Sequence, residues 1–110
     1  MTPHKKTILV DFDGVIHKYS KGWADGTAYD EPMEGARDAL ISLMDNWLVV
    51  VFSTRPADQI TEWLQKYDFP PFQVTNVKVP ATAIIDDRAI RFTNWTNTLN
   101  EFEAYYGDQK

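Results

Sequence analysis

The chain has 110 residues, no cysteine and a net charge of −5 at neutral pH. This length is typical of one domain with one hydrophobic core, so we expect residues 1–110 to form a single domain. Without cysteine, neither a disulfide framework nor a thiolate metal site can form. The negative charge disfavours non-specific binding to nucleic acid. No apolar stretch approaches a membrane span and no secretion signal is recognisable, so we expect a cytoplasmic protein with no membrane partner. The sequence leaves homo-oligomer formation open.

The first predicted strand lies in the run Thr-Ile-Leu-Val-Asp-Phe-Asp-Gly, residues 7–14. A short β-branched apolar run that ends at a turn signal favours a buried strand. Side chains alternate along a strand, so Asp11 and Asp13 share a face if the extended conformation continues to Asp13. Two neighbouring carboxylates repel each other unless a cation or a proton lies between them. We interpret the pair as ligands of a divalent metal.

Residues 15–30, here called the flap, are rich in Gly, Asp, Ser and Tyr. The Asp25-Gly26 pair is a hairpin turn signal, so the flap is expected to form a small two-stranded hairpin. Loops of this length in small domains are often functional. His17 and Trp23 are therefore candidate substrate contacts. The alternatives are that His17 is a surface residue and that Trp23 covers the flap's own apolar side.

Strands and helices are expected to alternate along the rest of the chain. The pattern predicts helices from Pro32 to about Asn46, from Pro56 to just before Pro70, and from an Asn94 or Thr96 cap to Gly107, with strands at residues 47–52, 72–74 and 83–85. Such alternation is typical of an α/β protein with right-handed crossovers. We therefore predict a parallel sheet in a three-layer α/β/α arrangement.

Polar side chains follow three of these predicted strands. The candidates are Asp11 and Asp13 after the first strand, Ser53 after the second, Asp86 and Asp87 after the last, and Lys78 eight residues before Asp86. The carboxyl ends of parallel strands meet at one edge of a sheet, where open α/β sheets bind their ligands. Mg²⁺ binds one or two carboxylates together with phosphate oxygens, and a hydroxyl and an ammonium stabilise a transferring phosphoryl group.

In this order the motifs resemble the haloacid dehalogenase superfamily, specifically its small Mg²⁺-dependent phosphatases, over residues 8–95. The resemblance implies a Rossmann-like fold in which Asp11 is the nucleophile that forms an aspartyl-phosphate. Asp13 would protonate the leaving oxygen and then activate water. Asp11, the Asp13 carbonyl and Asp86 would bind Mg²⁺, and Asp87 would bind it through water or orient the site.

The same resemblance assigns the phosphoryl oxygens to Ser53 and Lys78, with Thr54 as a competitor of Ser53. Ser53-Thr54-Arg55 resembles the Ser-Gly-Arg of some nucleic-acid-end phosphatases, which makes Arg55 a candidate substrate contact. An equally weighted alternative is that Arg55 bonds to local carbonyls or to the last acidic pair. Arg88 is a candidate phosphate contact, although pairing with local acids is the default interpretation.

The chain has no room for a cap domain, because only about eighteen residues separate Gly14 from Pro32. Members without a cap have open sites, and five basic residues follow or border the strand ends, namely Lys18, Lys21, Arg55, Lys78 and Arg88. A phosphorylated substrate, preferably a nucleotide or a nucleic-acid end, is therefore expected. The alternatives are small phosphorylated metabolites, a receiver-like module that accepts a phosphoryl group, and a metal-binding interaction subunit without turnover.

Overall fold

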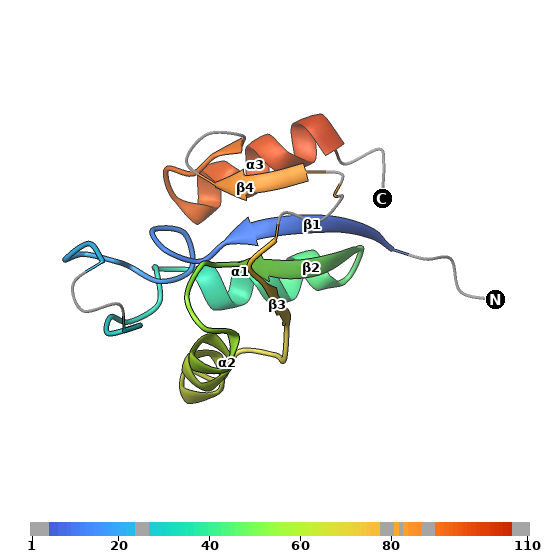
Figure 1. The fold of residues 1–110 in the computed structure, drawn as a ribbon. Helices are drawn as coiled ribbons and strands as arrows, with labels where there is room; N and C mark the ends of the chain where they lie inside the picture. Colours follow the sequence, from blue (N-terminus) through green and yellow to red (C-terminus); the bar gives the residue numbers. More distant parts are fainter. Residues whose placement is uncertain (1–4, 24–26, 78–80, 82, 87–89, 107–110) are drawn as a thin grey trace.

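The strand β1 (Lys6–Asp11) lies at the centre of a parallel sheet in the computed structural model, which describes residues 5–23, 27–77, 81, 83–86 and 90–106. The strand order is β3-β2-β1-β4-β5 (Figure 1). The other strands are β2 (Trp47–Phe52), β3 (Gln73–Thr75), β4 (Ala83–Asp86) and β5 (Ile90–Arg91). The predicted α/β class with a parallel sheet is confirmed, and β5 is a strand that the sequence pattern did not indicate.

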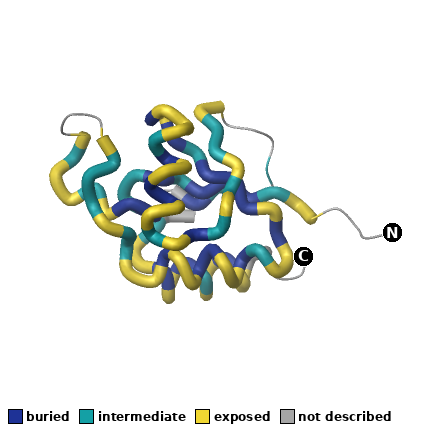
Figure 2. Tube along the Cα trace, turned by 90° about the horizontal axis from the view of Figure 1, so that it is seen from below, coloured by how far each residue is buried: buried dark blue, intermediate teal, exposed yellow. Residues whose placement is uncertain are grey.

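One side of the sheet carries the hydrophobic core. Ile8 on β1 pairs in register with Val49 and Ala83, and Val10 pairs with Val51 and Ile85. Side chains paired in this way share a face of the sheet, and all six of these residues belong to one buried cluster. The buried strands run through the middle of the chain trace, and the outward sides of the helices are exposed (Figure 2).

The three described helices all contribute to that same core. They are α1 (Ala36–Met44), α2 (Ala57–Lys66) and α3 (Trp95–Tyr106). Leu40, Trp63 and Phe102 are the large buried side chains, one from each helix. Phe102 of α3 packs edge-on against Trp47 of β2, with ring centroids 5.0 Å apart.

The described helices therefore share one core with the strands, and the three-layer arrangement stays a prediction. Residues 76–82 join β3 to β4, and most of this connection lies outside the described residues. Leu9 and Val50 point to the other side of the sheet and are also buried, at 0% and 2% exposure.

Two predicted boundaries also differ from the structure. Helix α1 begins at Ala36 rather than near Pro32. Gly35 has φ +79°, a left-handed conformation that a right-handed helix cannot include, so the helix cannot start before it. Pro32 instead pairs with His17 in an isolated antiparallel bridge. Asn94 caps α3 as predicted, since its Oδ1 accepts a hydrogen bond from the Asn97 N–H at 2.9 Å.

The flap is less regular than the predicted hairpin. Its first arm meets the two residues just after the flap, at the bridge between His17 and Pro32 and at the hydrogen bond from the Lys18 N–H to the Glu31 carbonyl, 3.0 Å. No longer strand pair occurs in the described parts of the flap. The predicted Asp25-Gly26 turn lies outside the described residues. No helix in the described ranges has the length and apolar character that crossing a membrane requires.

We expect Phe102→Ala to lower the free energy of unfolding by about 3–5 kcal/mol, because it removes a fully buried ring from the contact between α3 and β2. Ile41→Ala, on the exposed side of α1, is the matched control and should cost less than about 1 kcal/mol. Urea unfolding measures both values. Equal losses for the two variants would contradict the placement of α3 on the core.

Candidate functional site

The carboxyl edge of the sheet brings together three of the predicted site positions. Asp11 is the last residue of β1 and is paired with Phe52, the residue before Ser53. Val10 is paired with Ile85, so the register places Asp86, the last residue of β4, beside the end of β1. The backbone positions of Asp11, Ser53 and Asp86 therefore lie at the same edge of the sheet, as the sequence predicts. Lys78, Asp87 and Arg88 lie outside the described residues.

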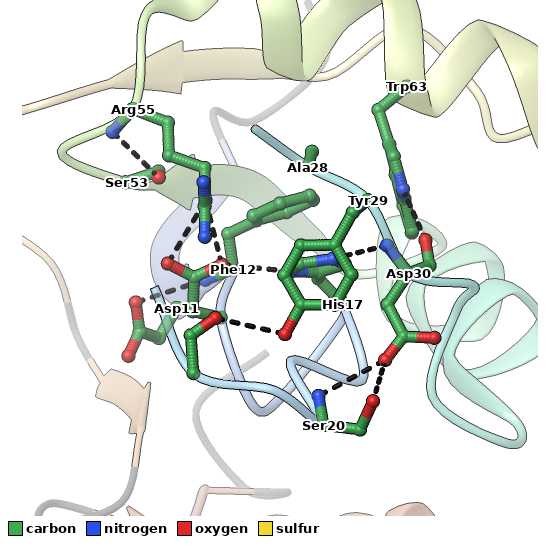
Figure 3. A network of polar contacts seen from close by, with 12 residues as sticks. Asp11, Phe12, His17, Ser20, Ala28, Tyr29, Asp30, Ser53, Arg55 and Trp63 are labelled. Atoms are coloured by element: carbon green, nitrogen blue, oxygen red, sulfur yellow. Dashed lines mark hydrogen bonds and ion pairs between the residues drawn. The ribbon is translucent and has the colours of Figure 1, made fainter. Parts of the chain in front are cut away.

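Asp13 is bound by the guanidinium of Arg55. The Arg55 Nε–H points to both carboxylate oxygens, at 3.0 Å from Oδ1 and 3.2 Å from Oδ2. The Arg55 side chain has no exposed surface, and that of Asp13 is 20% exposed. Figure 3 shows Arg55 extending from the loop after β2 toward the loop after β1. Arg55 is thus a partner of Asp13 rather than part of an exposed basic rim.

His17 is the second partner of Asp13, and its hydrogen bonds define its tautomer. Its Nε2 accepts the Asp30 backbone N–H at 3.0 Å, so in the neutral ring the proton is on Nδ1. That Nδ1–H donates to Asp13 Oδ1 at 3.0 Å. The His17 ring is completely buried and lies parallel to Phe12, with centroids 5.1 Å apart and planes 12° apart. His17 is therefore not the surface residue of the alternative interpretation.

Asp30, the last residue of the flap, joins it to Ser20 and to helix α2 through hydrogen bonds. Its Oδ2 accepts hydrogen bonds from the Ser20 hydroxyl and from the Ser20 N–H, the latter at 3.1 Å. Its Oδ1 accepts the Glu31 N–H, and its carbonyl accepts the Trp63 indole N–H of α2 at 2.8 Å (Figure 3). The hydrogen bonds from Ser20 and Glu31 lower the pKa of Asp30 to about 2.

A surface ion pair joins the first arm of the flap to the residue that follows the flap. The Lys18 ammonium donates to Glu31 Oε1 at 2.5 Å, and both side chains are exposed. The hydrogen bond and the charge of Glu31 raise the pKa of Lys18. Lys18, like Arg55, is therefore paired with a carboxylate of the chain itself.

The tip of the flap covers Arg55 with aromatic rings. The Arg55 Cζ lies 4.4 Å from the centroid of the Trp23 ring and 5.6 Å from that of Tyr19, both within cation–π range. Tyr19 has φ +58°, a left-handed conformation that is costly for an aromatic residue. Backbone strain of this kind is frequently retained at functional sites. Trp23 remains 47% exposed.

Ser53 and Thr54 differ in accessibility. Ser53 is 3% exposed, and its Oγ accepts the Arg55 backbone N–H at 3.1 Å, which leaves the hydroxyl proton available to a further acceptor. Thr54 is exposed. Residues 54–57 and 74–76 line a cavity of about 330 Å³ beside this loop. Both residues are at the carboxyl edge, and Ser53 is the one whose oxygen is fixed by the backbone.

The oxygen donors at this edge are of the kind that Mg²⁺ prefers. Asp11 is partly buried, and its Oδ1 accepts the Phe12 N–H at 3.0 Å. Both Asp13 carboxylate oxygens bond to Arg55, so a metal role for Asp13 depends on its backbone carbonyl, as the resemblance implied. Within the described residues, no cluster of three His, Asp or Glu side chains could hold a metal. The fit therefore depends on Asp11 together with the position of Asp86.

Sequence reasoning missed several residues of this network. Tyr29, Asp30 and Trp63 were not candidates, although the Asp30 carbonyl joins the flap to α2. It also missed Asp13 as the partner of Arg55, because the two are 42 residues apart and no local spacing links them. The one available signal was the Gly14-to-Pro32 segment itself, whose polar and aromatic content indicated a functional loop.

No family model, no curated protein and no solved structure matches this chain.

The hydrogen bonds of His17 predict that the proton of the neutral ring is on Nδ1 and not on Nε2. Proton–nitrogen correlation spectra of the imidazole distinguish the two tautomers directly. Asp13→Ala removes the acceptor of the Nδ1–H and should make this preference weaker. A wild-type spectrum with the proton on Nε2 would contradict the described contact with Asp30.

Ser20→Ala removes one donor to Asp30 and should raise the pKa of that carboxyl from about 2 toward its ordinary value of 3.8. Because the pKa is lowered in the folded state, the carboxylate stabilises the fold fully above pH 3.8, and this contribution disappears as the pH falls toward 2. An NMR titration of the Asp30 carboxyl measures the shift. Ser42→Ala, at an exposed site on α1, should leave it unchanged. An identical titration in Ser20→Ala would contradict the Ser20–Asp30 contact.

Proposed function

We propose that the protein is a Mg²⁺-dependent phosphomonoester hydrolase that acts through an aspartyl-phosphate on Asp11. The observation that carries this proposal is that the carboxyl ends of β1, β2 and β4 meet at one edge of the sheet. Asp11 and Asp86 end two of these strands, and Ser53 follows the third. The same proposal includes membership of the haloacid dehalogenase superfamily, the three-layer Rossmann-like fold of that superfamily and a cytoplasmic location for this protein. The flap takes the place of a cap domain.

Asp11 is the nucleophile of the proposed reaction. The Phe12 N–H bonds to Oδ1 and orients the carboxylate at the end of the central strand. One carboxylate oxygen attacks phosphorus, the bond from phosphorus to the leaving oxygen breaks, and Asp11 carries the phosphoryl group. Water then attacks phosphorus, and the bond to Asp11 breaks, which releases phosphate and regenerates the carboxylate.

Asp13 exchanges the proton in both steps. It gives a proton to the leaving oxygen in the first step and takes one from the attacking water in the second, so its protons balance over the cycle. Arg55 and His17 fix the position of this carboxylate through the bonds at 3.0 Å to Oδ1. Positioning of this kind lowers the entropic cost of the proton transfer.

Ser53 binds a phosphoryl oxygen through its hydroxyl proton, and Lys78 is proposed to bind another. The backbone of the loop fixes the Ser53 oxygen, because it already accepts the Arg55 N–H. Asp11, the Asp13 carbonyl, Asp86 and Asp87 are the proposed donors for Mg²⁺. The cation, when bound, supplies positive charge that offsets the charge of the phosphoryl group.

The proposed substrate is a nucleotide or a nucleic-acid end. A site with a flap in place of a cap domain suits a bulky leaving group, and the resemblance of Ser53-Thr54-Arg55 to end-processing phosphatases favours this class. Small phosphorylated metabolites are the competing substrate class. The role of Arg55 is proposed to be indirect, because its guanidinium is buried against Asp13 and beneath Trp23.

A receiver-like module is the second candidate function. It is favoured by one observation, namely that Asp13 is held by Arg55 and His17 in the described structure, which restrains it from exchanging protons. A long-lived phosphoryl group on Asp11 would then be the product rather than an intermediate. The lifetime of the phosphorylated protein decides between the two, since minutes favour the module and rapid loss favours the hydrolase.

We expect Asp11→Asn to reduce Mg²⁺-dependent hydrolysis by about 1,000-fold or more, because an amide cannot act as the nucleophile. p-Nitrophenyl phosphate and a panel of nucleotides are assayed with Mg²⁺ and with a chelator. Asp38→Asn, at an exposed site on α1, is the control and should keep full activity. Retained activity in Asp11→Asn, or no metal-dependent turnover of any substrate by the wild type, would contradict the proposal.

A further inference from the structure

Trp23 differs from the other tryptophans of the chain. Trp47, Trp63 and Trp95 are 2–4% exposed and belong to the core, whereas Trp23 is 47% exposed at the tip of the flap. One face of its indole lies on the Arg55 guanidinium at 4.4 Å. Its exposed surface is therefore the part that does not pack on Arg55.

The ring is held in this position by its surroundings. The Tyr29 hydroxyl accepts the Lys21 N–H at 2.6 Å and donates to the Gly22 carbonyl at 2.9 Å, which fixes the turn just before Trp23. Tyr29 itself packs edge-on against the buried His17, with centroids 5.2 Å apart. An aromatic ring fixed before its ligand arrives loses little conformational entropy on binding.

The Trp23 ring and Asp13 are linked through Arg55. The guanidinium that contacts the Trp23 face also binds Asp13 through Nε, so a single Arg55 side chain separates the indole from that carboxylate. Trp23 and Asp13 therefore both contact the side chain of Arg55, which places the indole near the carboxylate that would give a proton to the leaving oxygen. The other exposed large apolar residues, Ile41, Leu48 and Val77, come from α1, β2 and the segment after β3. Trp23 is thus a single ring rather than part of a described apolar patch of the kind that docks proteins.

We propose that the exposed part of the Trp23 indole stacks on the nucleobase of a nucleoside-phosphate substrate. The inference rests on the proposed hydrolase function, because it assigns the leaving group of that reaction. Every base has a π-face, so stacking on an aromatic side chain tolerates different bases, and it commonly contributes about tenfold or more in affinity per base. The shared chemistry is the base, which either a mononucleotide or a nucleic-acid end can supply.

Because the other three tryptophans are buried, a ligand that contacts an indole should change the fluorescence of Trp23 alone. We expect AMP to quench the tryptophan emission of the wild type saturably in the presence of a chelator, which prevents turnover. Inorganic phosphate should leave the emission unchanged. In Trp23→Phe the quenching should disappear, because only buried indoles remain. A short deoxyoligonucleotide with a terminal phosphate is the second arm, and the tighter of the two ligands identifies the source of the base.

Calorimetric titration supplies the affinities. Trp23→Ala should weaken AMP binding about tenfold, and Trp23→Phe should weaken it less because a ring remains over Arg55. Ribose 5-phosphate, which has no base, should bind the wild type and Trp23→Ala equally. The inference is overturned if neither AMP nor the oligonucleotide binds, if AMP binds without quenching, or if Trp23→Ala weakens ribose 5-phosphate as much as AMP. Absence of hydrolysis alongside AMP quenching would instead refute the proposed hydrolase and leave the stacking site standing.

Discussion

The ion pair between Arg55 and Asp13 is the interaction on which the rest of the site depends. It joins the loop after β2 to the loop after β1 across the carboxyl edge of the sheet, with the guanidinium fully enclosed. A buried charge that loses its partner is strongly destabilising, by about 3–5 kcal/mol. The pair therefore ties together the two loops that follow β1 and β2, and the rings of Tyr19 and Trp23 lie over its guanidinium.

A continuous chain of contacts extends from this pair into the flap. Asp13 binds His17, His17 accepts the Asp30 N–H, and the Asp30 carbonyl accepts the Trp63 indole N–H of α2. The flap is thereby tied to the sheet and to a helix without a regular hairpin of its own. If Asp13 exchanges protons with a substrate, the same carboxylate serves structure and chemistry. Its partners would then both position it and restrain it.

The regular parts of the fold were largely predictable because they depend on local patterns. The apolar runs before Asp11, Ser53 and Asp86 are strands, and Asn94 caps the last helix. The predictions went wrong where the deciding contact was not local. The start of α1 was set by the left-handed Gly35 rather than by Pro32. The candidate site was likewise predictable only in part. The strand ends converge because of the sheet topology, which the sequence indicated. The pairing of Arg55 with Asp13 cannot be inferred from any local spacing.

The central claim is that Asp11 receives the phosphoryl group, and acid quenching of the working protein tests it most directly. The wild type is mixed with Mg²⁺ and a radiolabelled phosphate ester that it hydrolyses, and then stopped in acid and digested. We expect a hydroxylamine-labile label, the signature of an acyl phosphate, on the peptide that contains Asp11. Turnover without any label on that peptide, or a label on another residue, would contradict the claim.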